Sequence, residues 1–498
     1  MLVFIYPVNL FDIKYFPEEW KEAKIFLLED PVYWGTDNDL KLNMNQLKLV
    51  LHRGSMKNYE DLLKRKGFQV EYVEEKDLRK GYKFLWGEGT KNDEVQFFDP
   101  VDHTLESKIK KELKEYNFKY TKIDSPGFLF SKKELESYLG IQETGKIKKD
   151  HFFHANFYKW SKKQLKLQKD LGSKTYDSEN RKALPKKISI PDLPKGDQDT
   201  NAGKEAIKYI KKNYAKNYGK AEDFYLPLDH SGSKKWFQYF LKKKFDNFGD
   251  YQDAISNKEP FLFHSVIAPL INIGLLDVSE VISETVKYYK NNYRSVGKNN
   301  FEGFIRQIIG WREYSRMLYV YVYDDIKGNY FNHKKKLTDK WYNGKLGIEP
   351  VDWTINVAFK YGYLHHILRL MMMANFMNLV GLHPDEVFKW FMEFSMDSYQ
   401  WVMHNNIYGM GTYADGGLTM RKPYLSSSNY ILKMSNFKKD GKWDTIWTDL
   451  FYHFLVEHEK KLDGTPYARN LYHFKKKSDK EQKELLKRAK DFIKSVTK

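Results

Sequence analysis

Short apolar runs alternate with helical stretches over residues 1–125. The runs LVFIYP, KIFLLED, FQVEYVE, VQFFDP and YTKID have the length and the β-branched and aromatic content of strands. Between them lie a long amphipathic segment from Leu42 to Lys66 and a charged one from His103 to Tyr116. This alternation predicts an α/β domain with a doubly wound parallel sheet. No G-x-G-x-x-G follows the first run, so the usual dinucleotide fingerprint is missing.

The pattern changes twice further along the chain. Residues 126–225 are Lys-rich and punctuated by proline, as in ALPKKISIPDLPKGDQ, which predicts a long interdomain linker over the protein surface. Over residues 226–498 apolar residues recur at spacings of three and four, as in SKKWFQYFLKKKF and DEVFKWFMEF. This periodicity predicts a large all-α domain. We therefore expect three parts, at 1–125, 126–225 and 226–498.

Charge and aromatic content narrow the classes of partner. The formal net charge is +18, from 84 Lys+Arg against 66 Asp+Glu, which favours a polyanionic partner such as nucleic acid. A solvated lysine surface explains the same count, and both interpretations stay open. Aromatic residues make up 16% of the chain and suit packing, stacking on planar rings or electron transfer, between which composition does not choose.

Cysteine is absent from the sequence. This excludes disulfides, thiolate catalysis and any Cys-ligated iron–sulfur cluster. The start, MLVFIYPVNLF, has no basic n-region, and no apolar run approaches the roughly 18 residues of a membrane span. We expect a soluble cytoplasmic protein.

The segment FIRQIIGWREYSR, residues 304–316, holds the first cluster of unusual side chains. If it forms one helix, Gln307, Trp311 and Tyr314 lie on one stripe with Arg312 alongside. An ordinary amphipathic helix with a buried tryptophan has the same periodicity, so this segment alone decides nothing.

A second cluster lies in YLHHILRLMMMANF. His365, His366, Arg369 and Asn375 stand on an otherwise Leu- and Met-rich helix, where they are costly to bury without partners. Histidine suits acid–base work because its ordinary pKa is about 6.5. No third ligand stands at metal spacing, so we predict no zinc site.

The run DSYQWVMHNNIYGMGTYADGG adds Asp397, Asn405 and Asn406 before a glycine-rich turn at Gly416 and Gly417. Glycines there allow the backbone to approach a ligand closely, although a plain turn has the same composition.

Read together, these stretches resemble the photolyase and cryptochrome family, most closely its bacterial (6-4) photolyase branch. The matching runs, in order, are HSVIAPLINIGLLD (264–277), FIRQIIGWREY (304–314), YLHHILRLMMMANF (363–376), WFMEFSMDSYQWV (390–402), NNIYGMGTYADGG (405–417) and KPYLSSSNYILKMS (422–435). Upstream, YDSENR (176–181) and NYGKAEDF (217–224) look like the same branch. The resemblance weakens only in the N-terminal domain.

The resemblance implies an α/β antenna domain joined by a long linker to a helical domain that holds FAD in a U-shaped conformation. By motif, the residues expected to bind FAD are His264, Ser265, Leu270, Asn272, Gln307, Trp311, Tyr314, Arg369, Asn375, Asp397 and Asn406. Within this set, Arg369 is expected to pair with Asp397 beside the isoalloxazine, and Asn375 to lie near flavin N5.

The activity implied by the resemblance is light-driven DNA repair. Reduced flavin absorbs blue light and passes an electron to a UV-damaged pyrimidine pair that is flipped out of the duplex. His365 and His366 match the histidines that face the lesion in (6-4) enzymes, where a protonated imidazole donates as the hydroxyl group moves back between the bases. A cyclobutane dimer needs no such proton, so the pair favours the (6-4) substrate. Tyr424 is expected on the lesion side.

For photoreduction of the flavin, the resemblance implies a chain of rings towards the surface. Trp390 and Trp341 match positions used in this branch, with Tyr430 as a further member. Without the resemblance, each ring is more simply explained by packing.

The sequence departs from the branch in two places. The branch carries iron–sulfur cluster cysteines after a Y-x-x-x-M-S-like motif, but here MSNFKKDGKWD puts Lys438 and Gly441 at those positions, so the cluster cannot form. The opening motif reads YPVNLF instead of a Gly-Asp-Gln-Leu-like turn. We therefore expect no tightly bound 6,7-dimethyl-8-ribityllumazine antenna, although SMKNY (55–59) is similar to the helix that borders that pocket.

Alternative functions remain open at this point. A cryptochrome-type photoreceptor shares the flavin and the aromatic chain, a cyclobutane dimer photolyase shares the pocket, and a passive nucleic-acid-binding protein needs only the basic surface. The last leaves Arg369, Asp397 and Asn375 unexplained. We expect a monomer that acts on UV-damaged DNA, with Asp177 and Glu179 on a solvated surface and no bound metal.

Overall fold

The computed structural model describes residues 1–498 except 86–93, 142–144, 146 and 148–151. The N-terminal domain is built on one 5-stranded parallel sheet with the strand order β3-β2-β1-β4-β5. The strands are β1 (Leu2–Ile5), β2 (Lys24–Leu28), β3 (Gln69–Val73), β4 (Glu94–Phe98) and β5 (Lys119–Ile123). The predicted doubly wound α/β domain is confirmed.

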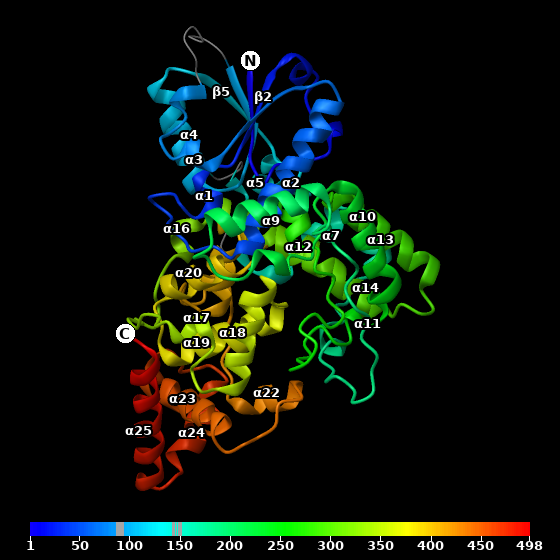
Figure 1. Ribbon diagram of the computed structural model, residues 1–498. Helices are drawn as coiled ribbons and strands as arrows, with labels where there is room; N and C mark the ends of the chain where they lie inside the picture. The colour runs from blue at the N-terminus through cyan, green and yellow to red at the C-terminus, as the bar shows by residue number, and fades with distance from the viewer. Residues whose placement is uncertain (86–93, 142–144, 146, 148–151) are drawn as a thin grey trace.

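Helices cover both faces of this sheet. The longer ones are α2 (Gln46–Arg65) and α4 (His103–Glu115), on opposite sides of the strands (Figure 1), with the short α1 (Pro31–Trp34) and α3 (Glu75–Leu78) beside them. β2 and β3 extend the sheet to one side of β1, while β4 and β5 extend it to the other. Because crossover connections are right-handed, the two directions of winding place their helices on opposite faces.

The segment predicted as a linker contains more helix than its composition suggests. Its α-helices are α5 (Lys132–Leu139), α7 (His154–Gln164), α8 (Gln168–Leu171) and α9 (Asn201–Asn213). α9 packs along α2, with Ala206 and Ile210 fully buried and its lysines turned outward. One small apolar stripe is enough to seat such a helix, because lysine stems lie along the protein surface while their ammonium groups stay in water.

The rest of the chain is helical, as predicted. Its α-helices are α10 (His230–Lys243), α11 (Phe245–Phe248), α12 (Ala268–Asn272), α13 (Val278–Asn292), α14 (Lys298–Ile305), α15 (Glu313–Tyr321), α16 (Tyr323–Ile326), α17 (Lys340–Asn343), α18 (Glu349–Tyr361), α19 (Asn375–Val380), α20 (Pro384–Phe394), α21 (Gln400–His404), α22 (Ser428–Met434), α23 (Trp443–Glu457), α24 (Tyr467–Lys475) and α25 (Asp479–Val496). Its π-helical segments are η7 (Arg306–Arg312), η8 (Leu368–Ala374) and η9 (Asn405–Gly411). No helix in the described part of the chain is both long and apolar enough to cross a membrane.

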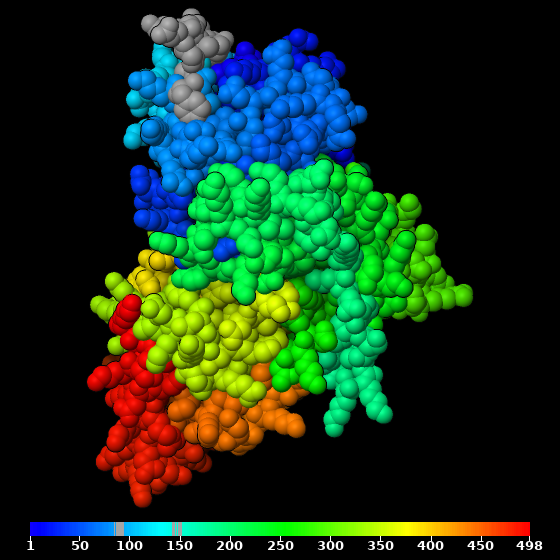
Figure 2. Space-filling view, viewed as in Figure 1, coloured from blue at the N-terminus to red at the C-terminus, as the bar shows by residue number. Residues whose placement is uncertain are grey.

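The molecule is elongated, with the α/β domain at one end and α23, α24 and α25 at the other (Figure 2). The N-terminal end of α2 joins the two domains. The backbone N–H of Asn45, its N-cap residue, donates to the carbonyl of Glu393 at 2.7 Å, and its side chain donates to the carbonyl of Phe359 at 2.9 Å. These bonds fix α2 against α18 and α20 of the helical domain.

Candidate functional site

The π-helical segments coincide with predicted site residues. η7 contains Gln307 and Trp311, η8 contains Arg369, and η9 contains Asn406. A π-helical turn makes i→i+5 hydrogen bonds, and such turns are frequent at functional sites. η8 and η9 pack against each other, so the second and third predicted clusters meet in the fold.

Arg369 and Asp397 form an ion pair. Nη2 of Arg369 donates to both carboxylate oxygens of Asp397, at 2.8 and 3.0 Å. The hydroxyl of Ser395 donates to the same carboxylate, and the side chain of Asn272 donates to the backbone carbonyl of Asp397 at 3.1 Å. The two side chains are 15% and 9% exposed, so each charge depends on the other for compensation.

Two histidines stack close to this pair. The rings of His264 and His365 have centroids 4.5 Å apart and planes inclined by 9°. Both are buried, and Nε2 of His264 and both ring nitrogens of His365 have no partner among the described residues. Burial lowers the pKa of His264 to about 3 and holds that of His365 well below its usual range. Both imidazoles are therefore neutral near pH 7.

His366 differs from its neighbour because its side chain is exposed. Desolvation by the protein around the ring, followed by the cations of Arg369 and Arg306, lowers its pKa to about 4 against the opposing effect of Asp177. His366 is thus an accessible neutral imidazole close to two arginines. An anion bound beside it would raise its pKa and favour the imidazolium.

Asn375 is fully buried and engages Ser426. Its Nδ2 donates to the hydroxyl of Ser426 at 3.0 Å, and its Oδ1 accepts from the backbone N–H of Ser426 at 3.2 Å. Nδ2 also donates to the carbonyl of Met371 at 3.2 Å. Both ends of the amide are therefore fixed by the protein.

Trp390 and Trp341 lie together in the core, each fully buried. The indole nitrogen of Trp390 donates to the carbonyl of Trp341 at 2.8 Å, and that of Trp341 donates to the carbonyl of Val496 at 2.8 Å. The ring of Phe394 lies 4.7 Å from that of Trp390 and 5.7 Å from the Arg369 guanidinium. Rings thus connect the ion pair with the tryptophans.

Tyr430 is not part of this arrangement. Within the described residues it makes no ring contact with Trp390 or Trp341, and it lies near the charges of Asp253 and Arg181 instead. Tyr424, half-buried, lies near Asp177 and the same two charges, and burial raises its pKa. Both tyrosines are therefore neighbours of a charged cluster.

That cluster includes Asp177, which had been expected on a solvated surface. Its carboxylate accepts from Arg306 at 2.7 Å and from Arg181, so it belongs to an arginine network. No group of three or more possible metal ligands occurs among the described residues.

The predicted stripe of Gln307, Trp311 and Tyr314 contacts a helix of the linker segment. Trp311 stacks on His154 of α7, with ring centroids 3.7 Å apart and planes inclined by 14°. Gln307 donates to the carbonyl of Gly303 at 3.4 Å, and the buried Tyr314 donates to the carbonyl of Phe152. His154 was not predicted, because only the fold brings α7 to η7.

Three further residues expected at the flavin lie at least partly buried in the helical domain. The carbonyl of Ser265 accepts from the indole of Trp236 at 2.9 Å, Leu270 is fully buried, and Asn406 is half-buried. The side-chain amide atoms of Asn378 and Asn405 are also buried, without partners among the described residues. Such buried donors and acceptors, with the ion pair and the unpartnered histidines, fit a planar ligand rich in hydrogen-bonding atoms.

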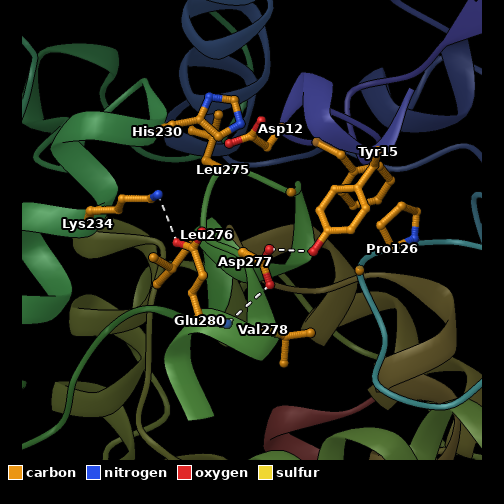
Figure 3. Close-up of a pocket in the computed structure, with 13 residues that line it drawn as sticks. Asp12, Tyr15, Pro126, His230, Lys234, Leu275, Leu276, Asp277, Val278 and Glu280 are labelled. Carbon is orange, nitrogen blue, oxygen red and sulfur yellow. Dashed lines mark hydrogen bonds and ion pairs between the residues drawn. The ribbon is translucent and has the colours of Figure 1, made fainter. Parts of the chain in front are cut away.

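A small pocket lies elsewhere, between the loop after β1 and the start of α13 (Figure 3). Its free space is about 10 Å³, room for one water molecule. Tyr15 donates to Asp277 at 2.5 Å, and Lys234 pairs with Glu280 at 2.8 Å across it. None of the predicted site residues lines it, so it is not the functional site.

Comparison with known sequences identifies relatives of this chain. Residues 3–226 match the family model described as "Deoxyribodipyrimidine photo-lyase-related protein", including the domain in which the resemblance was weakest. A (6-4) photolyase of Agrobacterium fabrum is 33% identical over 312 residues, which are 60% of this chain and 61% of that protein. The match thus spans less than two thirds of that relative. An uncharacterised protein of Acanthamoeba polyphaga mimivirus is 57% identical over 94 residues, 19% of this chain and 76% of that protein.

Solved structures share the fold. A bacterial class III photolyase from Agrobacterium tumefaciens aligns with a TM-score of 0.55 at 15% identity, covering 99% of this chain and 98% of that one. A cryptochrome from Synechocystis aligns with a TM-score of 0.53 at 13% identity, covering 97% and 93%. By fold, the chain is similar to photolyases and cryptochromes. By sequence, it is similar to a photolyase-related family and to a bacterial (6-4) photolyase, and it has no cysteine that could hold an iron–sulfur cluster.

Proposed function

We propose that this protein is a light-dependent DNA photolyase that binds FAD and repairs the (6-4) photoproduct. The observation that carries the proposal is the placement of an exposed imidazole, that of His366, three residues before Arg369 of the buried ion pair. This one turn of the chain would thus supply both Arg369 for cofactor binding and His366 as a proton donor to the substrate.

The ion pair and its surroundings support FAD as the cofactor. Arg369, Asp397 and Asn272 would hold the flavin ring side, while Gln307, Trp311 and Ser265 would hold the rest of the molecule. When bound and reduced, FAD supplies the light-driven electron for opening the lesion. Trp390 and Trp341 suit the reduction of oxidised flavin, because both are buried and joined through a hydrogen bond.

His366 suits the (6-4) lesion. The hydroxyl group of that lesion must return to its original base, and a positioned imidazolium donates the proton that this transfer needs. The pKa of His366 is low without substrate, but DNA phosphates and an electron-loaded lesion are anions that raise it. His365 lies buried behind, stacked on His264, and so fixes the backbone from which His366 projects.

The protein's charge supports DNA as the partner. The formal net charge is +18, and Arg421 and Lys422 are exposed next to Tyr424. Exposed cations bind phosphates and position a duplex without reading its sequence. A distorted lesion is cheap to flip, which supplies selectivity.

We propose that no lumazine antenna binds tightly. In doubly wound folds ligands bind at the carboxyl edge of the sheet, outside the point where the strand order reverses. Here that edge is filled by Tyr6, Tyr33, Trp34 and Tyr82, none more than 3% exposed. This packing supports the expectation drawn from the altered opening motif.

The test is an absorption spectrum of the purified protein, followed by blue light with two oligonucleotides. One carries a single (6-4) lesion and the other a single cyclobutane dimer, each with a dark control. Restoration of the (6-4) oligonucleotide alone supports the proposal. Restoration of the dimer alone would assign the other photolyase activity, and bound flavin without any restoration would indicate a photoreceptor.

A further inference from the structure

A lysine of the α/β domain is buried against the functional site. Lys48 belongs to α2 and is 1% exposed. Its ammonium donates to the backbone carbonyl of Ser398 and lies 4.6 Å from the ring centroid of Tyr399. Among the described residues, no carboxylate lies within ion-pair distance of it. Burying a lysine without a carboxylate partner is costly, so packing alone does not explain this side chain.

The position of Lys48 connects it to the ion pair. Ser398 and Tyr399 directly follow Asp397, so Lys48 contacts the same turn that Arg369 contacts. The place of Lys48 is fixed in turn by Asn45, one turn earlier, which is bonded to α18 and α20. The turn that carries Asp397 is thus held by both domains.

Lys48 adds a titratable cation to a site whose ion pair is neutral overall. Arg369 and Asp397 carry opposite unit charges and neutralise each other. The groups that act on Lys48 are Asp397 and Asp102, which favour its charged form, and burial, which opposes it and lowers its pKa to about 7. The neighbouring His52 has its pKa held well below the usual range by burial, so it adds no charge. Lys48 is therefore the cation that can respond to a new anion in the site.

We propose that Lys48 is a positioning residue of the flavin site. It holds the turn from Ser395 to Tyr399 that presents Asp397 to Arg369, and its ammonium supplies the net positive charge that balances an anionic reduced flavin. This inference rests on the proposed function, since it requires FAD to bind at the ion pair. It gives the α/β domain a part in the site that is independent of any antenna.

The test compares Lys48→Met with Lys48→Arg and with a matched control. Lys162 is the control, because it is also buried, donates to a backbone carbonyl, that of Gly172, at 3.0 Å, and lies 4.8 Å from a tyrosine ring, that of Tyr158. FAD affinity is measured by fluorescence titration of the apoprotein in the dark, and the midpoint potential of the bound flavin by spectroelectrochemistry.

We expect Lys48→Met to weaken FAD binding roughly tenfold, because the turn that presents Asp397 loses its charge-assisted hydrogen bond from Lys48. Its flavin potential should become more negative, because the anionic reduced form loses its balancing charge. Lys48→Arg should keep a potential close to that of the wild type, and Lys162→Met should leave both quantities unchanged.

Several results would overturn the inference. One is an unchanged affinity and potential in Lys48→Met, and another is an equal loss in Lys162→Met, which would make the effect general to buried lysines. If Lys48→Met does not fold, Lys48→Gln replaces it, and a potential in Lys48→Arg shifted as far as in Lys48→Gln would exclude the charge role. Failure of the wild-type protein to bind FAD would instead refute the proposed function.

Discussion

The indole nitrogen of Trp390 donates a 2.8 Å hydrogen bond to the backbone carbonyl of Trp341, and both rings are fully buried. This contact joins α20 to α17 in the core. Since Phe394 contacts both the ring of Trp390 and the guanidinium of Arg369, the ring of Phe394 connects the ion pair with the two tryptophans.

Trp390→Phe should slow photoreduction of the bound oxidised flavin several-fold and leave repair by chemically reduced protein intact. Phenylalanine keeps the packing but is too hard to oxidise. The rate is followed by the loss of oxidised-flavin absorbance under blue light with a thiol reductant. Trp20→Phe is the control, because Trp20 is equally buried but lies in the α/β domain, bonded to Gln96. An unchanged rate in Trp390→Phe would remove this residue from the electron path.

Arg369→Met and Asp397→Asn should each destabilise the apoprotein by about 3 kcal/mol, because each leaves the opposite charge buried without compensation. The double variant should lose much less than the sum of the two single losses. Urea denaturation of all four proteins measures this coupling. Additive losses would mean that the ion pair seen here contributes nothing as a pair.

His366→Ala should abolish (6-4) repair while FAD affinity stays unchanged. Because His366 is exposed, its removal should change the free energy of unfolding by no more than about 0.5 kcal/mol. His365→Ala is the comparison, since it removes a buried ring stacked on His264 and should destabilise the fold. Repair that survives His366→Ala would sink the assigned role as proton donor.

Asp444→Ala should destabilise the loop where Lys438 and Gly441 stand in place of the cluster cysteines of the branch that the sequence resembles. Asp444 accepts from the backbone N–H of Asp440 at 3.2 Å and of Gly441 at 2.8 Å, and it is 4% exposed. Losing these two hydrogen bonds to a carboxylate should cost about 1–3 kcal/mol, measured by urea denaturation. Asp463→Ala, at an exposed turn, is the control and should have little effect. Adding an iron chelator should not change the free energy of unfolding of either variant.

The strands and the large helical domain could be predicted from sequence because their apolar residues recur with clear periods. The helices of the linker could not. In α9 only Gly203, Ala206 and Ile210 are buried, and lysines conceal so narrow a stripe. The spacing of apolar residues also did not predict the π-helical segments η7 and η8, because their wider i→i+5 turns leave no separate signal in the apolar pattern.

The site was predictable only where a motif carried it. The resemblance implied that Arg369 meets Asp397, and the structure brings them together. Lys48 and His154 had no such signal, because each looks like an ordinary residue of an amphipathic helix. Only the fold places Lys48 against Ser398 and His154 against Trp311. For Tyr430, the role in electron transfer that the resemblance implied stays a prediction, since among the described residues no ring contact joins it to Trp390 or Trp341.

Lys48 should also make the stability of the protein depend on pH above neutrality. Burial lowers its pKa to about 7 in the folded protein, against an ordinary value of 10.5. Between these values the unfolded chain holds a proton that the folded protein has released, so the free energy of unfolding rises with pH. The slope should approach about 1.4 kcal/mol per pH unit.

Asp102, whose pKa burial raises to about 7, acts mainly below this window and with the opposite sign. Urea denaturation at pH 7, 8 and 9 would test the assignment to Lys48. Both Lys48→Met and Lys48→Arg should lose the slope, the first because nothing titrates and the second because arginine stays charged. Lys66→Met, at the exposed end of α2, should keep it. A slope that persists in both Lys48 variants would assign the released proton to another group.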